Sequence, residues 1–208
     1  MIESLLAMGV FEWTGLISGL LCVVLLIRKN IWTWPIGLVY SIVSLVVFYQ
    51  AQLYSEFGLH IYYVGMNAYG WYFWSRPSTH ANAERKQKSE RSVTRIAPRT
   101  AIVLALLVLA GIPILAEIMQ RTTDADLAYI DSTITVLSFA AMWMSARKML
   151  ENWAVWLVVD VIATGVYLVK GIELYAVLYG VYIVMAVAGH LAWRAELASA
   201  KEYQQAAP

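Results

Sequence analysis

The sequence contains seven apolar stretches whose lengths determine the fold class before any motif is considered. They cover Trp13–Ile27, Thr33–Ala51, Gly58–Ser75, Thr100–Ile118, Tyr129–Ala146, Trp153–Val169 and Ile172–Trp193. A helix needs about 20 apolar residues to cross the ~30 Å hydrocarbon core of a bilayer. With 61% hydrophobic and only 14% charged residues, the chain is too apolar for a soluble domain of 208 residues. These stretches predict an all-α integral membrane protein with seven transmembrane helices.

The distribution of basic residues predicts the orientation of these helices. Of the 15 Lys and Arg residues, all but Arg121 and Lys170 fall in connections on one side of a chain that crosses the membrane seven times. Because basic connections stay in the cytosol, we expect the amino terminus outside and the carboxyl terminus inside. The basic loop 76–99 and the tail 195–208 are then cytosolic. Their position on the cytosolic side already explains their positive charge, so no nucleic-acid partner is expected.

Residues 12–75 and 129–194 share an ordered set of features, which indicates two related three-helix blocks. Arg28-Lys29, Trp32, Leu53-Tyr54 and Gly70 before Trp74 match Arg147-Lys148, Trp153, Leu174-Tyr175 and Gly189 before Trp193, with small length changes. One linking helix over 100–118 keeps the two blocks in the same orientation. The expected plan is therefore 3+1+3 with parallel repeats, and such transporters bind substrate near the midplane between the halves.

Asp160 indicates a site most strongly, because a charge within an apolar membrane stretch costs about 2.5–3.5 kcal/mol. Polar and aromatic stripes at helical spacing are His60, Tyr63, Asn67, Trp71 and Trp74; Trp153, Trp156, Asp160, Thr164 and Tyr167; Tyr175, Tyr179, Tyr182, Gly189 and Trp193; and Asp131, Thr135, Ser138, Met142 and Ser145. Tryptophans near helix ends also form interfacial belts, and small polar residues also serve helix contacts. The site prediction therefore depends on the residues near mid-span, which are Asp160, Asn67, Ser138 and Tyr182.

The sequence carries no P-loop, HExxH or GxSxG motif, and its three histidines have no metal-ligand spacing. We therefore expect no catalytic site, no metal and no cofactor. A retinal protein would need a lysine within 172–193, and none is present. A seven-helix receptor without a chromophore is the less favoured alternative. A homo-oligomer is left open, because no lipid-facing Gly-x-x-x-Gly face stands out.

Two motifs occur at related places in the two blocks. One is Glu151-Asn152-Trp153-x-x-Trp156-x-x-x-Asp160, continuing to Tyr167-x-x-Lys170-Gly171 and Leu174-Tyr175; the other is Trp34-Pro35-x-Gly37, Leu53-Tyr54 and Tyr69-Gly70-Trp71-x-x-Trp74. Together they resemble the PnuC family of vitamin transporters over residues 28–193. The chain departs from the family's Asp-x-x-x-Gln in the third stretch, where it has Glu56-x-x-x-His60.

The resemblance implies a bundle related in plan to the SWEET sugar transporters, in the bacterial cytoplasmic membrane, that carries nicotinamide riboside by facilitated diffusion. A cytosolic kinase that phosphorylates the vitamin would make uptake one-way. Thiamine and riboflavin, carried by relatives, are the alternatives. A tryptophan face stabilises a cationic ring, such as that of nicotinamide riboside or thiamine, by about 0.5–2 kcal/mol. The expected ligand-binding residues are Asp160, Trp156, Asn152, Asn67, Trp71, Tyr63, His60, Tyr182, Tyr179 and Trp34.

Overall fold

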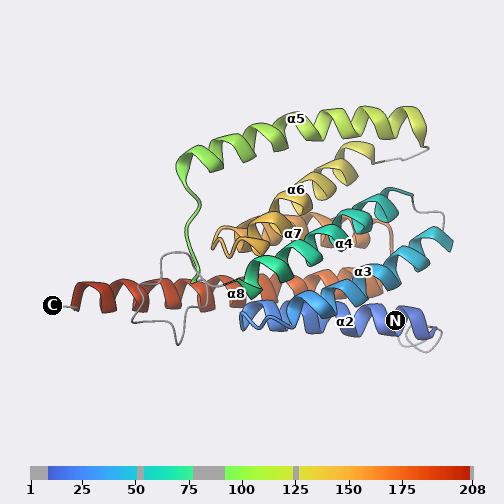
Figure 1. Ribbon diagram of the computed structural model, residues 1–208. Coiled ribbons are helices and arrows are strands. Elements are labelled where there is room, and N and C mark those ends of the chain that lie inside the picture. Colours follow the sequence, from blue (N-terminus) through green and yellow to red (C-terminus); the bar gives the residue numbers. More distant parts are fainter. Residues whose placement is uncertain (1–8, 51–53, 77–91, 124–126, 207–208) are drawn as a thin grey trace.

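Seven helices make up most of the described chain in this computed structural model, which describes residues 9–50, 54–76, 92–123 and 127–206 (Figure 1). They are α2 (Val10–Ile27), α3 (Thr33–Gln50), α4 (Tyr54–Ser75), α5 (Pro98–Thr122), α6 (Ala128–Ala146), α7 (Asn152–Val169) and α8 (Glu173–Ala206). Each expected apolar stretch is thus a helix. α5 begins at Pro98 rather than Thr100, because proline suits the first turn of a helix. α8 continues beyond Trp193 into the segment expected as a tail.

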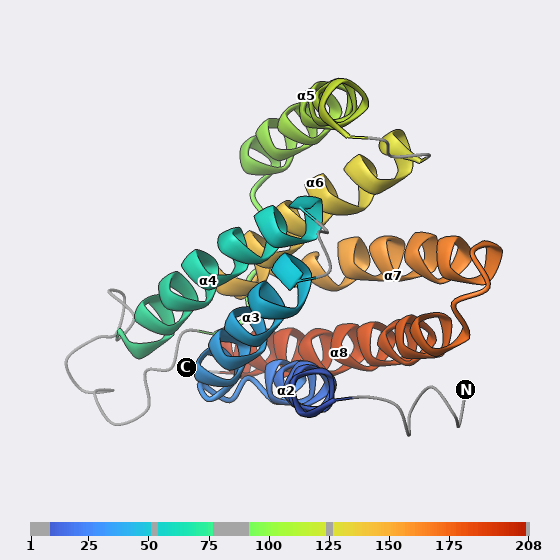
Figure 2. The same cartoon turned by 90° about the vertical axis from the view of Figure 1, so that its right-hand side faces the viewer.

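The helices pack as two groups of three with α5 at one edge. α3 packs against both α2 and α4, and α7 packs against both α6 and α8. We call α2–α4 the first triplet and α6–α8 the second triplet. Contacts of α4 with α6 and of α2 with α8 join the triplets, while α5 packs against α6 (Figures 1 and 2). The triplets therefore meet along two helix pairs.

Four of the described helices are long and apolar enough to cross a membrane, namely α3, α5, α7 and residues 173–200 of α8, and Trp13–Ile27 is a shorter apolar helix. α4 and α6 are not among these four, and they carry buried polar side chains such as His60, Asn67 and Ser138. Polar side chains at membrane depth usually face the bundle interior. α5 shows the opposite pattern, because its Ile102, Leu106 and Leu109 are exposed. Lipid would cover such a face.

Three helices end in the same kind of turn, with a residue in the left-handed region: Lys29 (φ 55°), Lys148 (φ 54°) and Gly171 (φ 68°). The closing bonds are Lys29 N to Leu26 O and Asn30 N to Leu25 O after α2, Lys148 N to Ser145 O and Met149 N to Met144 O after α6, and Gly171 N to Leu168 O and Ile172 N to Tyr167 O after α7. This Schellman arrangement satisfies two of the carbonyls that a helix end exposes. The final carbonyls of α2 and α6, at Ile27 and Ala146, are left for other partners.

The end of the bundle that carries the Arg28-Lys29 and Arg147-Lys148 turns, here called the basic end, holds two buried tryptophan pairs within one hydrophobic cluster. Trp34 meets Trp74 edge to face at 5.2 Å between ring centroids, and Trp153 meets Trp193 in the same way at 5.4 Å. A Cβ on Gly70 would collide with the Trp34 ring, and one on Gly189 would collide with the Trp153 ring. Trp34 therefore packs in the first triplet as Trp153 packs in the second triplet, whereas Trp32 is exposed. The sequence match of Trp32 with Trp153 is wrong for this reason.

Part of the basic loop before α5 is bound to the turn between α6 and α7. Thr94 receives a backbone hydrogen bond from Leu150 and donates one to Lys148, and the Ile96 N–H donates to a Glu151 carboxylate oxygen at 2.9 Å. Val93 is buried. Residues 93–96 of the basic loop 76–99 therefore pack against the bundle, while residues 77–91 lie outside the described part.

Candidate functional site

Asp160 lies on α7 with 5% of its surface exposed. Within the described ranges, its carboxylate accepts no hydrogen bond; the Thr164 hydroxyl donates at 2.7 Å to the Asp160 backbone carbonyl instead. The carboxylate is close enough to interact electrostatically with Tyr63 on α4 and Tyr182 on α8. A buried carboxylate without a protein partner is costly. The free energy of folding therefore gains little from this group, and a ligand role is its best explanation.

A row of tyrosines extends from Tyr182, one of the two tyrosines near this carboxylate. Tyr182 packs edge to face on Tyr179 at 5.8 Å, and Tyr179 stacks on Tyr167 at 5.3 Å. On α2, a Cβ added to Gly19 would lie 3.0 Å from the Tyr182 hydroxyl and 3.2 Å from the Tyr40 ring. Gly19 therefore lets α2 approach the tyrosines closely. The result is an aromatic wall with phenol hydroxyls, able to hold a flat ring.

Asn67 lies on α4, is 2% exposed, and is only half satisfied. Its Nδ2 donates to the Ser41 hydroxyl at 3.2 Å and to the Tyr63 carbonyl at 2.8 Å. Its Oδ1 is buried, and no described donor reaches it. A Cβ on Gly37 would collide with this amide, so glycine is required opposite Asn67. The Asn67 Oδ1 thus lies against the α3 backbone at Gly37 without a described donor.

Trp156 is held by a hydrogen-bonded chain rather than by packing alone. Its Nε1 donates at 3.1 Å to the Ser145 hydroxyl, whose single hydrogen is shared between the Ala141 carbonyl at 2.9 Å and the Oδ1 of Asn152 at 3.1 Å. The Asn152 Nδ2 donates in turn to the Met149 carbonyl. Asn152 is fully buried and satisfied on both sides. Its position suits orienting the Trp156 ring better than contacting a ligand.

His60 is buried among aromatic rings, with centroids of Phe48 at 4.8 Å, Tyr63 at 5.2 Å and Tyr40 at 5.5 Å. Its Nδ1 lies 2.8 Å from the Glu56 backbone carbonyl. Because a carbonyl only accepts, Nδ1 carries the hydrogen. Nε2 is left to accept from the Tyr40 hydroxyl at 3.4 Å. The ring is thereby fixed next to Tyr63.

Two of the expected site residues lie apart from this cluster. Trp71 is 44% exposed, although it lies one turn along α4 from the buried Asn67. Trp34 is 2% exposed and belongs to the aromatic cluster at the basic end, where its Nε1 meets no described acceptor. The described contacts connect His60, Tyr63 and Asn67 on α4, and Tyr179 with Tyr182 on α8, with Asp160 near Tyr63 and Tyr182. Trp156 and Asn152 lie toward the basic end, where Trp156 packs against the cluster that contains Trp34.

The sequence stripes left α3 out, yet the structure adds Tyr40 and Ser41 to the site. Gly37, Ser41 and Ser44 are buried on one face of α3, and their spacing of four and three residues is that of a helix stripe. This spacing is the feature of the sequence that indicates the buried face of α3. It is weaker than the other stripes because small residues also serve helix contacts.

Comparisons with known proteins agree over nearly the whole chain. A family model described as nicotinamide mononucleotide transporter matches residues 9–195. The nicotinamide riboside transporter PnuC of Escherichia coli (strain K12) is 27% identical over 201 residues, with 88% of this chain and 84% of that protein covered. The riboflavin/roseoflavin transporter RibM of Streptomyces davaonensis is 29% identical over 185 residues, with 88% and 83% covered. The crystal structure of the vitamin B3 transporter PnuC has a TM-score of 0.72 at 20% identity, with 89% of this chain and 81% of that chain covered, and thus the same fold.

Proposed function

Because the chain belongs to the PnuC family of vitamin transporters, we propose that it carries nicotinamide riboside across the bacterial cytoplasmic membrane by facilitated diffusion. Its apolar helices and its family make it a multi-pass membrane protein, and its relatives are transporters rather than enzymes. The observation that carries the proposal is the buried Asp160 carboxylate with no described hydrogen-bond donor, near Tyr63 and Tyr182.

The charge of the ligand follows from this carboxylate. Nicotinamide riboside has a positively charged pyridinium ring, and a desolvated carboxylate close to a cation is stabilised far more strongly than one in water. The Trp156 indole, oriented through Ser145, supplies a face that stabilises a cation by about 0.5–2 kcal/mol. Tyr63, Tyr179 and Tyr182 complete the aromatic wall.

The remaining polar groups suit the amide and the sugar of this ligand. The buried Asn67 Oδ1 has no described donor, so it is suited to accept from the carboxamide N–H of the ligand. The phenol hydroxyls of Tyr63 and Tyr182 and the fixed His60 ring are suited to the ribose hydroxyls. Asn152 acts through Trp156, and Trp34 closes the site toward the basic end.

The helix plan that we propose is 3+1+3, with the first and second triplets as parallel repeats and α5 as the linker. The matched packing of Trp34 on Gly70 and of Trp153 on Gly189 supports it, as does the packing of α5 on α6. The basic end faces the cytosol, as basic connections do. Transport then proceeds as one triplet rocks against the other around the midplane site.

A uniporter of this kind equilibrates its substrate and needs neither ATP nor an ion gradient. Net uptake comes from a cytosolic kinase that phosphorylates the vitamin and so removes it from the equilibrium. The direct test is uptake of radiolabelled nicotinamide riboside into vesicles that hold the purified protein. Equal concentrations inside and outside without a gradient support uniport; strict dependence on an imposed proton gradient contradicts it.

Riboflavin is the second candidate substrate, because the relative RibM is a riboflavin/roseoflavin transporter. Riboflavin is flat and neutral, so it would use the aromatic wall without using the charge of Asp160. Calorimetric titration of the purified protein with nicotinamide riboside, thiamine and riboflavin separates these candidates. Saturable binding of riboflavin alone would reassign the substrate.

A further inference from the structure

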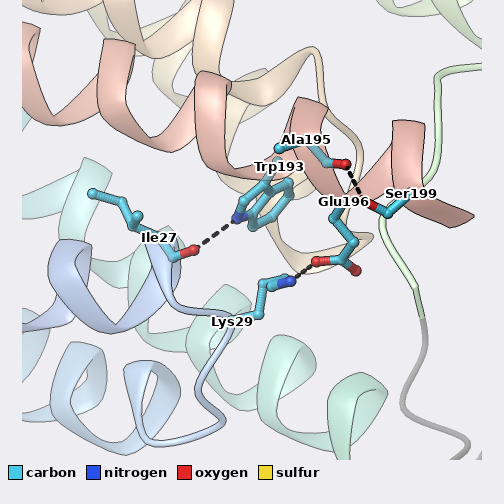
Figure 3. Close-up of polar contacts among 6 residues, drawn as sticks. All are labelled: Ile27, Lys29, Trp193, Ala195, Glu196 and Ser199. Atoms are coloured by element: carbon cyan, nitrogen blue, oxygen red, sulfur yellow. Dashed lines mark hydrogen bonds and ion pairs between the residues drawn. The ribbon is translucent and has the colours of Figure 1, made fainter.

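Two tryptophans tie the triplets together at the basic end, each by capping a helix of the other triplet. Trp74 of α4 donates from Nε1 at 3.0 Å to the carbonyl of Ala146, the last residue of α6. Trp193 of α8 donates at 3.2 Å to the carbonyl of Ile27, the last residue of α2 (Figure 3). These are the carbonyls that the Schellman turns leave without a partner. The triplets cannot part here unless both bonds break.

Both indoles are buried and braced, so the two bonds have a fixed geometry. Trp193 is fully buried and Trp74 is 8% exposed. Trp34 meets Trp74, and Trp153 meets Trp193, at interplanar angles of 83° and 87°. A buried carbonyl that lost its donor would be left unsatisfied, which is the costly outcome for a polar group. The closed arrangement is therefore favoured over a partly opened one.

The lysines of the same turns also reach across to the opposite triplet. Lys29 forms an ion pair with Glu196 of α8 (Figure 3), and the Lys148 ammonium lies 4.1 Å from the centroid of the Trp74 ring. A left-handed backbone conformation is costly for lysine and not for glycine. The equivalent turn at the other end of the bundle uses Gly171. Lysine at the basic end is thus explained by its side chain, which bridges the triplets.

The opposite end of the bundle is joined differently. There the carboxylates of Glu56 on α4 and Asp131 on α6 repel each other, and the Lys170 ammonium after α7 attracts both. Nearer mid-helix, the Tyr62 hydroxyl of α4 donates at 2.9 Å to the Phe139 carbonyl of α6. The basic end is where two bonds of this kind and an ion pair join the triplets.

We propose that Trp74 and Trp193, with the Lys29–Glu196 pair, form a reciprocal latch that closes the basic end of the transport path and opens when substrate leaves there. This inference rests on the proposed transport function. The two latch tryptophans adjoin the candidate site through Trp156, and they are not among the proposed ligand contacts. Its residues set the population of the state open at the basic end, and they leave the affinity of the site nearly unchanged.

Trp74→Phe and Trp193→Phe test the latch, because each keeps a ring and removes the donor. The reporter is Ala186→Cys, a buried α8 position in the same cluster, in a Cys22→Ser background that removes the single native cysteine. A polar maleimide should label the reporter roughly five-fold faster in each variant, the population change expected for one lost hydrogen bond. Trp32→Phe, at an exposed tryptophan of the same end, is the matched control and should label like the parent. Unchanged labelling in both latch variants overturns the proposal.

A charge swap covers the case in which a phenylalanine variant fails to fold, as judged by elution and melting temperature. Lys29→Glu should speed labelling, and Lys29→Glu combined with Glu196→Lys should restore the parent rate. If the single variant labels like the parent, or the double variant stays as fast as the single one, the ion pair is no part of the latch and the proposal fails.

Labelling is measured without substrate, so its outcome does not depend on the identity of the vitamin. Calorimetry of the parent with nicotinamide riboside tests the proposed function separately. Slow labelling in the parent and fast labelling in the variants, without any vitamin binding, would keep the latch and reject the substrate. If the parent binds the vitamin but the parent and the variants all label at the same rate, the substrate is kept and the latch is rejected.

Discussion

The first and second triplets carry the same residues at the basic end and different residues in the middle. The shared positions are Lys29 and Lys148, Trp34 and Trp153, Gly70 and Gly189, and Trp74 and Trp193, each pair with the same separation in the sequence. At these positions the packing of the two triplets also matches. Shared residues thus build the joint between the triplets.

At the same separation, the mid-helix positions differ. Gly37 corresponds to Trp156, Ser41 to Asp160, His60 to Tyr179 and Asn67 to Ala186. In the first triplet, Gly37 on α3 makes room for the Asn67 amide on α4. In the second triplet, the large residue is on α7 and the small one on α8. In the proposed site, the first triplet then supplies an acceptor and the second triplet supplies an aromatic ring and a carboxylate, as an asymmetric ligand would require.

Asp160→Asn should have the largest effect, because it removes the charge that distinguishes Asp160 from the corresponding Ser41. The variant keeps the shape of the side chain and removes its charge, so we expect nicotinamide riboside to bind about 30- to 100-fold more weakly, as for the loss of a charged hydrogen bond. Calorimetry on folded protein measures this. Thr164→Val is the matched control, because the Thr164 hydroxyl bonds only to its own helix. Equal affinities in all three proteins would contradict the site assignment.

Gly70→Ala and Gly189→Ala test the shared joint. Each new methyl group would collide with a buried indole, Trp34 or Trp153, and overpacking of this kind costs about 1–3 kcal/mol of stability. Both melting temperatures should fall by similar amounts. Gly180→Ala, where a Cβ meets no atom within 4 Å, is the control and should melt like the parent. If the melting temperature fell in only one of the two variants, Gly70→Ala or Gly189→Ala, the triplets would not share this packing.

Trp156→Phe and Ser145→Ala sharpen the role of the hydrogen-bonded chain. Each removes the bond that orients the Trp156 ring, and each should weaken ligand binding by about 1 kcal/mol. Because both changes remove the same bond, the double variant should bind no more weakly than the worse single variant. Additive losses would mean that Ser145 acts on the ligand by another route.

Trp71→Phe should have the smallest effect. Trp71 is 44% exposed and lies apart from the site cluster, so affinity should change by less than about 0.5 kcal/mol, as for ordinary surface substitutions. The measurement is the same calorimetric titration. A loss as large as that of Trp156→Phe would place Trp71 at the ligand and would support the prediction from its sequence stripe.

Apolar length predicted the helices because a bilayer demands about 20 apolar residues whatever the tertiary packing. Sequence spacing also placed Asp160, Asn67 and Tyr182, since costly polar groups at membrane depth must face inward. It could not separate Trp32 from Trp34, because both are tryptophans near one turn and only packing on Gly70 distinguishes them. Nor could it show that Asn152 is satisfied by Ser145 and Met149, because those bonds depend on the turn after α6.

Recognition of a positive charge by Asp160 is the central element of the proposed site. The most direct measurement compares the affinities of the parent protein for nicotinamide riboside and for its dihydro form, which has nearly the same shape and no charge on the ring. We predict that the charged form binds at least about tenfold more tightly, in line with the strength of charge-assisted and cation–π contacts. Equal affinity for the two forms would contradict the account.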